Sequence, residues 1–248
     1  MCGFLITNYD NLRDQRNILK HRGPDNYKHI SINKINFHFN RLKILDLNNR
    51  SNQPFRFKNY ILCYNGEIFN YLEIKSRLEK LNYRFKTSSD TEVLIYSFVE
   101  WGKECLEMFE GMFSFVIYDQ RKGEFFLGRD AFGIKPLFYY IQNNKFILSS
   151  EIKNILKYNI KTSINKTSLN YFLNFGVYQN NKNTFYKNIY SLEPGHCAIF
   201  NKNKFQTFKW YKTKSIKVST KTIDIDSDIK FLINKAIKLS LRSDKEVA

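Results

Sequence analysis

Short apolar stretches rich in aromatic and β-branched residues recur along the first 150 residues of the chain. Such stretches are typical of strands that face a buried core. We therefore predict strands at residues 4–7, 35–39, 61–64, 113–118, 125–127, 138–141 and 146–148. Between the third and fourth of these, residues 71–81 and 90–101 repeat their apolar positions at helical spacing. Strands, then two helices, then further strands predict an α+β fold of packed sheets flanked by helices.

The second predicted helix carries signals at both of its ends. Ser89 stands three residues before Glu92, which is the capping-box pattern of a helix start. Gly102 follows the last residue with helical spacing and is a typical helix stop. We therefore predict that this helix begins directly after Ser89 and ends at Gly102.

The pattern changes after residue 195. We predict a last hairpin over residues 198–210 that turns around 201–204, and then a polar linker rich in Lys, Ser and Thr. From about residue 223 to 241 apolar residues return at helical spacing, with Asp near the start and Lys and Arg near the end, as the helix dipole favours.

These patterns divide the chain into three parts. Residues 1–200 are predicted to form one domain, 201–222 the end of the hairpin and a linker, and 223–248 the first helix of a further domain. A lone amphipathic helix leaves its apolar face uncovered. We expect either that the rest of this further domain is missing from the sequence or that the helix docks onto a partner.

Composition narrows the function classes. The chain has 248 residues, of which 43% are hydrophobic and 25% charged, so it can bury a core and is not disordered as a whole. No apolar run reaches the roughly 18 to 20 residues that span a bilayer, and the N-terminus lacks the basic and apolar regions of a signal peptide. We expect a cytoplasmic protein without a membrane partner.

The net charge of +17 raises the question of nucleic-acid binding. The Lys residues, however, are spread along the whole chain, without an Arg-rich stripe or a nucleic-acid-binding motif. We expect a solvated basic surface and no nucleic-acid partner.

The four cysteines are Cys2, Cys63, Cys105 and Cys197, and their wide spacing favours neither a zinc site nor a disulfide framework. We predict that the last three are packing residues. Removal of Met1 would give Cys2 a free α-amine with an ordinary pKa of about 7.7 to 8.0, able to accept the thiol proton at neutral pH. The alternative is that Cys2 is only a small residue at the start of a strand.

Several ordered motifs decide between these readings of Cys2. They are MCGF at 1–4, HRGPD at 21–25, RLKILD at 41–46, QP at 53–54, YNGEIFNY at 64–71, SDTE at 89–92, GMFSFVIYD at 111–119, RDAFGIKPLFYY at 129–140, SSEIK at 149–153 and LEPG at 192–195. In order and spacing, residues 1–200 resemble the glutaminase domain of the class II glutamine amidotransferases, in its asparagine synthetase (glutamine-hydrolysing) branch.

This resemblance implies a fold. The glutaminase part is expected to be a four-layer αββα N-terminal-nucleophile hydrolase sandwich. The helix near the C-terminus is then expected to start a truncated α/β synthetase domain of the ATP pyrophosphatase type, because LRSDKEVA at 241–248 matches the stretch that leads into the pyrophosphate-binding loop in this family.

The chemistry of glutamine hydrolysis needs a thiolate, a base and donors for the tetrahedral oxyanion. Cys2 supplies the first two. The side-chain amide of Asn65 and the backbone N–H of Gly66 are the candidate oxyanion donors. Taken alone, Asn-Gly is instead a strong signal for a two-residue hairpin turn.

The resemblance also implies how the amino-acid end of glutamine is bound. Arg41 is expected to pair with the α-carboxylate, Asp90 with help from Glu67 to accept from the α-ammonium, and backbone groups of Ile44 and Leu45 to line the same pocket. Without the resemblance, Arg41 reads equally well as a surface cation and Asp90 as an acid in the first turn of a helix.

Other residues of the motifs are expected to have structural roles. Arg22 and Asp25 are predicted to hold the loop around the nucleophile. No catalytic role and no metal site is predicted for the four histidines.

The expected function is therefore hydrolysis of glutamine to glutamate and ammonia through a Cys2 thioester, without a cofactor. The ammonia would serve ATP- and Mg²⁺-dependent amidation of aspartate by a synthetase domain absent from this sequence, or by a partner chain, with a homodimer possible. One alternative is an ammonia-donating subunit for another acceptor, such as a cell-surface sugar. Another is a non-catalytic remnant that binds glutamine or a partner, as expected if Met1 is retained.

Overall fold

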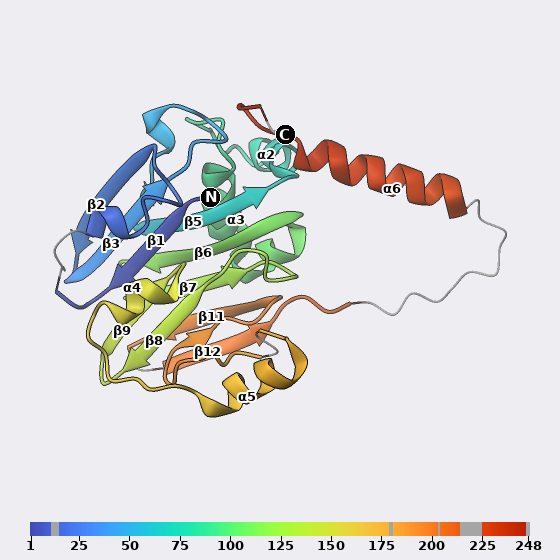
Figure 1. The fold of residues 1–248 in the computed structure, drawn as a ribbon. Coiled ribbons are helices and arrows are strands. Elements are labelled where there is room, and N and C mark those ends of the chain that lie inside the picture. The colour runs from blue at the N-terminus through green and yellow to red at the C-terminus, as the bar shows by residue number, and fades with distance from the viewer. Residues whose placement is uncertain (11–14, 179–180, 203, 214–224, 247–248) are drawn as a thin grey trace.

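A computed structural model describes residues 1–10, 15–178, 181–202, 204–213 and 225–246. Two six-stranded antiparallel sheets form its body (Figure 1). The strands of the first sheet are, in spatial order, β10 (Tyr190–Ser191), β8 (Phe138–Gln142), β9 (Lys145–Ser149), β1 (Gly3–Thr7), β3 (Ile35–Arg41) and β2 (Asn26–Ile32). Those of the second are β12 (Lys204–Lys209), β11 (His196–Asn201), β7 (Glu124–Arg129), β6 (Gly111–Asp119), β5 (Tyr60–Ile68) and β4 (Phe55–Phe57).

All seven strands predicted from apolar stretches are confirmed, most of them extended by one or more residues. The hairpin predicted over residues 198–210 is β11 and β12, whose strands pair from His196↔Lys209 to Asn201↔Lys204. The strands that the sequence analysis missed are β2, β4 and β10, and each lies at a sheet edge or next to it. Edge strands bury only part of their surface, so they lack the apolar run that marks a central strand.

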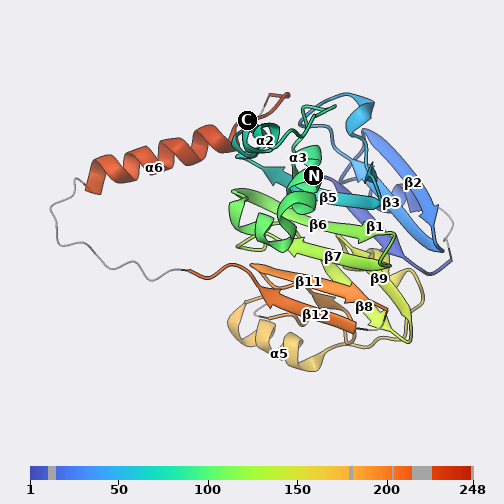
Figure 2. The same ribbon diagram turned by 180° about the vertical axis from the view of Figure 1, so that it is seen from behind.

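Three apolar clusters show how the layers stack. The two sheets pack face to face through side chains such as Phe4 and Phe37 from one sheet and Ile61 and Val116 from the other. On the outer face of the first sheet lie α1 (Gln15–Ile18) and α4 (Ile152–Leu156), the latter through Ile155. The outer face of the second sheet is covered by two helices that are longer than α1 and α4 (Figure 2).

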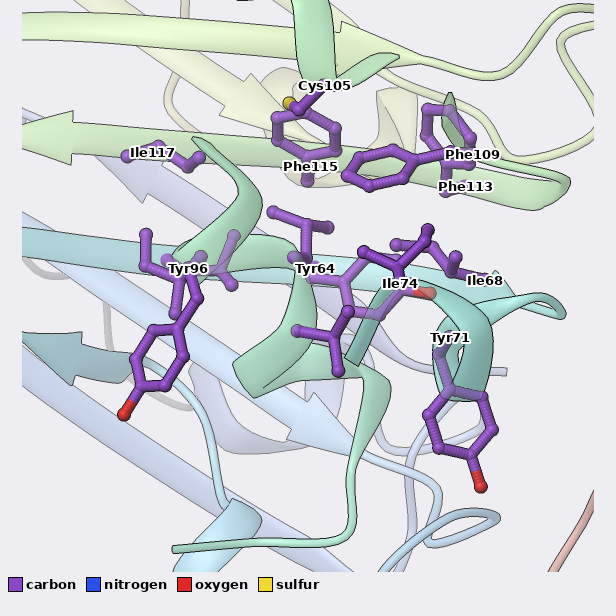
Figure 3. Close-up of a cluster of buried hydrophobic side chains, with 14 of the residues drawn as sticks. Tyr64, Ile68, Tyr71, Ile74, Tyr96, Cys105, Phe109, Phe113, Phe115 and Ile117 are labelled. Atoms are coloured by element: carbon purple, nitrogen blue, oxygen red, sulfur yellow. The ribbon is translucent and has the colours of Figure 1, made fainter. Parts of the chain in front are cut away.

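Those helices are α2 (Tyr71–Lys80) and α3 (Asp90–Trp101), and both confirm the prediction from sequence. They cover the second sheet through a cluster that includes Tyr64, Ile74 and Phe113 (Figure 3). The 3-10 helix η2 (Gly102–Met108) continues from α3, and η1 (Asn49–Ser51) lies in the loop before β4. The expected four-layer αββα sandwich is thus confirmed.

The start of α3 differs from the predicted capping box. Ser89 does cap the helix, since its Oγ accepts from the Thr91 N–H at 3.2 Å. The Glu92 carboxylate does not return to the Ser89 N–H, which donates instead to Thr87 Oγ1 at 3.3 Å. Glu92 accepts from the N–H groups of Lys86 and Thr87, at 3.0 and 2.7 Å. The capping box was therefore wrong in its second half, because the chain before Ser89 bends back and offers Glu92 nearer donors.

The other end of α3 and the cysteines agree with the sequence analysis. Gly102 adopts a φ of 58° and its N–H donates to Phe98 O, as expected of a helix stop. Cys63 is buried between the sheets, and Cys105 and Cys197 are buried in the cluster beneath α3, so all three are packing residues.

Two further helices lie outside the four layers. The sequence analysis missed α5 (Lys166–Phe175), which lies at the end of the sandwich near β12. The predicted C-terminal helix is α6 (Ile225–Ser240), which projects away from the sandwich and ends beside α2 (Figure 1). Residue 223 and most of the predicted linker, 214–222, lie outside the described residues. None of the described helices is long and apolar enough to cross a membrane.

Candidate active site

Cys2 lies directly before β1, where β1 and β3 run side by side in the first sheet. Its thiol sits against the Leu42 backbone, 3.4 Å from the nitrogen and 3.5 Å from the carbonyl oxygen. The Arg22 Nε–H donates to the Cys2 carbonyl oxygen at 2.9 Å. The backbone and the sulfur of Cys2 are thus both fixed by neighbouring loops.

Arg22 is itself held by a cluster of charges. Its guanidinium lies 3.1 Å from Glu151, and the same carboxylate is 2.7 Å from His21 and 2.9 Å from Lys153. Burial tends to raise the pKa of Glu151, but the hydrogen bonds from these three side chains outweigh it and lower that pKa. The prediction that Arg22 holds the loop around Cys2 is confirmed.

Asp25 has a similar role on the opposite side of the same turn. Its Oδ2 accepts from the Lys43 N–H at 2.8 Å, and its own N–H donates to Arg41 O at 3.1 Å. Gly23 lets the turn come close, because a Cβ there would lie 2.3 Å from the Asn40 carbonyl. The HRGPD turn is therefore tied to the end of β3, which agrees with the prediction that Asp25 holds the loop around Cys2.

Asn65 and Gly66 lie inside β5, not in a turn. They pair with Ser114 and Phe113 of β6 in an unbroken antiparallel register, so the hairpin-turn interpretation was wrong. Gly66 has a φ of 155°, and a Cβ there would lie 2.2 Å from Met112 O. Only glycine fits this close approach of two strands.

The backbone of β5 presents the Gly66 N–H to the edge away from β6. On that edge the Tyr64 N–H donates to Gln53 Oε1 at 2.7 Å and the Ile68 N–H to Asp90 Oδ2 at 3.0 Å. Because alternate residues of a strand direct their backbone groups to the same edge, the Gly66 N–H lies between these two donors. It therefore points towards the pocket described next.

A pocket beside Cys2 brings together all eight site residues expected from sequence. Its lining consists of Met1, Cys2, Arg41, Leu42, Ile44, Leu45, Gln53, Tyr64, Asn65, Gly66, Glu67, Ser89, Asp90, Thr91, Met112 and Lys135. The Asn65 side chain is fully buried, and within the described residues neither its Oδ1 nor its Nδ2 has a hydrogen-bond partner. An unpaired buried amide costs about 1–3 kcal/mol, so the missing partner of Asn65 needs an explanation.

The acidic side of the pocket is formed by Asp90 and Glu67. Asp90 Oδ2 accepts from Tyr64 Oη at 2.7 Å as well as from Ile68. Burial raises the pKa of Asp90, although these hydrogen bonds oppose the rise. Burial, and then the charge of Asp90, raise the pKa of Glu67. Two desolvated carboxyl groups in one pocket favour a cationic ligand.

Arg41 lines the pocket, but its guanidinium is engaged with the chain. Nη1 donates to Asn48 O and Asn52 Oδ1, both at 2.8 Å, and Nη2 donates to Leu45 O at 3.0 Å and Asp46 O at 2.5 Å. In this conformation Arg41 fixes the loop that carries Ile44 and Leu45. Its pairing with a glutamine carboxylate stays a prediction.

Lys135 is a pocket residue that the sequence analysis did not single out. It is buried, with 5% of its surface exposed, although it lies in a loop. The Asp130 carboxylate holds that loop through the N–H groups of Ile134 and Lys135, at 2.9 and 3.0 Å. Burial lowers the pKa of Lys135, and Glu67 partly opposes this. Its place in the RDAFGIKPLFYY motif was the only signal, because nothing in the pattern sets a loop lysine apart.

Asp46 holds the pocket loop together from within. Its carboxylate accepts from the Ser88 N–H at 3.0 Å, Arg50 Nε at 2.9 Å and the Asn48 N–H at 3.2 Å. Burial tends to raise the pKa of Asp46, but these hydrogen bonds outweigh it and lower the pKa below its ordinary 3.8. The ionised form is therefore the one that stabilises the fold.

We expect Asp46→Asn to lower the unfolding temperature at pH 7 by about 4–8 °C. Hydrogen bonds to a charged group contribute about 2 kcal/mol to the free energy of unfolding. In a chain of this size, the loss of that contribution corresponds to this shift in temperature. Asn accepts the same backbone conformation, and the substitution removes the charge and replaces one acceptor oxygen by an NH₂ group that cannot accept. A carboxyl group whose pKa is lower in the folded than in the unfolded state stabilises the fold above the unfolded-state pKa, and this stabilisation is lost as the pH falls. The difference in unfolding temperature between the two proteins should therefore narrow below about pH 3.9. Thermal unfolding of both proteins from pH 7 to 3 measures this, and a constant difference would contradict it.

No group of three or more His, Cys, Asp and Glu side chains within the described ranges is placed to hold a metal ion. The residues gathered in the pocket include instead the Cys2 thiol, the unpaired Asn65 amide and the carboxyl groups of Glu67 and Asp90. Together with the four-layer sandwich, a pocket built around residue 2 defines the class of N-terminal-nucleophile hydrolases.

Comparison with known proteins narrows this class. A family profile described as "Glutamine amidotransferase domain" matches residues 1–211. The chain is 35% identical over 92% of its length to a putative asparagine synthetase [glutamine-hydrolyzing] 2 of Methanocaldococcus jannaschii, covering 48% of that protein. It is 29% identical over 92% of its length to asparagine synthetase [glutamine-hydrolyzing] 3 of Bacillus subtilis, covering 38%. The chain therefore belongs to the glutamine amidotransferase family and spans about half or less of these relatives.

The solved structures agree on the fold. Glutamine phosphoribosylpyrophosphate amidotransferase from B. subtilis, in complex with ADP and GMP, superposes with a TM-score of 0.54 at 21% identity, over 85% of this chain and 43% of that one. At this identity the likeness establishes the shared sandwich.

Proposed function

We propose that this chain hydrolyses glutamine to glutamate and ammonia with Cys2 as an N-terminal nucleophile. The observation that carries the proposal is the buried, unpaired amide of Asn65 in the pocket that Cys2 lines. A site that stabilises charge developing only during the reaction needs a hydrogen-bond donor that has no partner beforehand.

The reaction begins with proton transfer from the Cys2 thiol to its own α-amine, once Met1 has been removed. The sulfur attacks the side-chain amide carbon of glutamine, and the tetrahedral oxyanion accepts hydrogen bonds from Asn65 Nδ2 and the Gly66 N–H. The protonated amine then gives its proton to the leaving nitrogen, which departs as ammonia. Water hydrolyses the resulting γ-glutamyl thioester to glutamate and restores the thiol.

While Met1 is attached, the α-nitrogen of Cys2 is part of a peptide bond and cannot act as the base. Burial raises the pKa of the Cys2 thiol, and contact with Leu42 and the nearby positive charges only partly oppose the rise. A neutral thiol without an adjacent amine is a weak nucleophile. Processing of Met1 is therefore part of the proposal.

The rest of the pocket would orient glutamine. Asp90 and Glu67 take the α-ammonium, which relieves the repulsion and desolvation that raise their pKa values. Arg41 and the loop at Ile44 and Leu45 take the carboxylate end. Because the Leu45 carbonyl is bound by Arg41, the Arg41 side chain positions the loop as well as contributing charge.

The ammonia is proposed to serve the amidation of aspartate, as the names of the relatives suggest. ATP and Mg²⁺ would act in a synthetase domain or partner chain, and the glutaminase step itself needs no cofactor. We propose a cytoplasmic location and no nucleic-acid or membrane partner. A homodimer is a further proposal that follows from the family resemblance alone.

The test is glutamate release from glutamine by the purified chain, after mass spectrometry has confirmed that Cys2 is the first residue. Production of glutamate and ammonia in equal amounts supports the proposal. Absence of glutamate with a free Cys2 would overturn it and leave a pocket that binds without turnover.

The charge of Lys135 should influence the proton transfer at the N-terminus. Burial lowers the pKa of the Met1 α-amine, and the nearby Lys135 ammonium lowers it further because it disfavours a second positive charge. We expect Lys135 to act in the same way on the Cys2 amine once Met1 has been removed. We expect Lys135→Met to reduce kcat/KM and to move the acidic limb of its pH profile to higher pH. Exposed Lys122 in the β6–β7 turn provides a matched control, since Lys122→Met should change neither. A profile that drops without shifting would contradict this role.

A further inference from the structure

The residues that follow α6 return to the amidotransferase fold and lie near α2 (Figure 1). We call residues 242–245 the C-terminal strap. The Asp244 N–H donates to Ile44 O at 3.0 Å, and Asp244 Oδ2 accepts from the Asp46 N–H at 2.7 Å. Two hydrogen bonds from one residue thus bracket Leu45, whose neighbour Ile44 also lines the pocket.

Arg242 anchors the strap at a second point. Its two terminal nitrogens each lie 2.6 Å from an oxygen of Glu73 in α2, and Nη1 also donates to Phe69 O at 2.8 Å. Phe69 follows directly after β5, the strand that carries Asn65 and Gly66. The strap therefore joins the loop on one wall of the pocket to the end of the strand on the other.

The loop under the strap needs to be held. Asp46 has a φ of 46°, a left-handed conformation that costs free energy for a residue other than glycine. The carbonyl oxygens of Leu45 and Asp46 are both bound by Arg41. Asp244 supplies the partner of the Asp46 N–H on the opposite side of the same peptide segment. Loss of that partner removes one of the contacts that hold this loop and leaves those made by Arg41 and by the Asp46 carboxylate.

We propose that Asp244 is a positioning residue for glutamine binding: it holds the loop at residues 44–46 in the shape that receives the substrate. The inference rests on the proposed function, since it assumes that glutamine occupies this pocket. Thermodynamic linkage requires the reverse effect as well, so bound glutamine favours the docked strap. Any segment joined to the strap would thereby be coupled to occupancy of the pocket.

The experiment compares three variants of the full chain with a free Cys2. Asp244→Ala removes the acceptor of the Asp46 N–H and should raise KM for glutamine about fivefold to tenfold, with kcat within about twofold, because the catalytic groups are untouched. Asp244→Asn keeps an oxygen at the same position. Its increase in log KM over the wild type should be at most half of the increase seen for Asp244→Ala. Asp228→Ala removes an exposed acid from α6 and should match the wild type.

A second arm measures binding without turnover. Glutamine is titrated by calorimetry into Cys2→Ala and into Cys2→Ala with Asp244→Ala, and Kd should rise by the same factor as KM. Unfolding temperatures within about 2 °C of each other exclude a general loss of stability.

The outcomes separate the inference from the proposed function. If the chain hydrolyses glutamine, a KM for Asp244→Ala equal to that for Asp228→Ala, and a Kd unchanged by Asp244→Ala in the Cys2→Ala chain, would overturn the inference and leave the function intact. A weaker Kd without any turnover would support the inference and overturn the function. No binding of glutamine at all would overturn both.

Discussion

Replacing Cys2 with alanine should abolish glutamate release, to below the detection limit of the assay. Among the described residues that line the pocket, Cys2 carries the only thiol; the other sulfur atoms are the thioethers of Met1 and Met112, which are not acyl acceptors. Loss of a covalent nucleophile removes the whole thioester route and leaves only the binding and oxyanion groups. The measurement is glutamate production at saturating glutamine, beside wild-type chain of verified N-terminus.

Retention of the residue before Cys2 should have the same effect for a different reason. A fusion with a protease site directly before Cys2 has the thiol but no adjacent amine to accept its proton. We expect the fusion to be inactive and its cleavage to restore full activity. Activity of the uncleaved fusion would show that another group is the base.

A buried cysteine outside the pocket serves as the control for Cys2. Cys105 packs beneath α3 with its side chain fully buried, so Cys105→Ala should lower stability and leave kcat unchanged. If Cys105→Ala reduced turnover as strongly as Cys2→Ala, the assignment of Cys2 as nucleophile would fail.

The second large effect is expected at Asn65. Its amide is buried and unpaired, so the structure already carries the cost of leaving it without a partner. Asn65→Leu, which has a similar volume and no polar atoms, should reduce kcat about 10²- to 10³-fold because one oxyanion donor is lost. The free energy of unfolding should stay the same or rise by about 1 kcal/mol, since the unpaired groups are removed. Steady-state kinetics and denaturant unfolding of the same preparation measure both.

A loss of activity without a loss of stability in Asn65→Leu distinguishes a catalytic role of Asn65 from a packing role. Asn174→Ala, at an exposed site on α5 far along the chain, should alter neither quantity. If Asn65→Leu lost activity and stability together, the amide would be a structural group of β5, and the oxyanion role would have to pass to the Gly66 N–H alone.

The layered fold was largely predictable because its central strands are nearly continuous apolar runs. Residues 113–118 and 125–127 face two apolar layers at once, so they carry no polar alternation to obscure them. The edge strand β2 is half-exposed along most of its length and has no such run. The second half of the capping box failed for a related reason, since the competing donors of Lys86 and Thr87 depend on how the preceding loop folds back.

Some residues of the site could be predicted from the sequence and others could not. Family resemblance identified the eight residues, and the structure brings them all into one pocket. The family resemblance did not predict that four hydrogen bonds would hold the Arg41 guanidinium against its own loop. Nor did the sequence single out Lys135, since a lysine in a loop is solvated by default.

The sequence by itself determined the central strands and the helices α2, α3 and α6, because these depend on local patterning. The position of Cys2 beside the N-terminus, together with the motifs around it, pointed to Cys2 as the proposed nucleophile. Only the tertiary structure decided that Asn65 and Gly66 lie in a strand and not in a turn, and that residue 244 meets residues 44–46. Both outcomes depend on contacts between segments far apart in the chain. Such contacts are set by the packing of the layers, and no local pattern of residues records them.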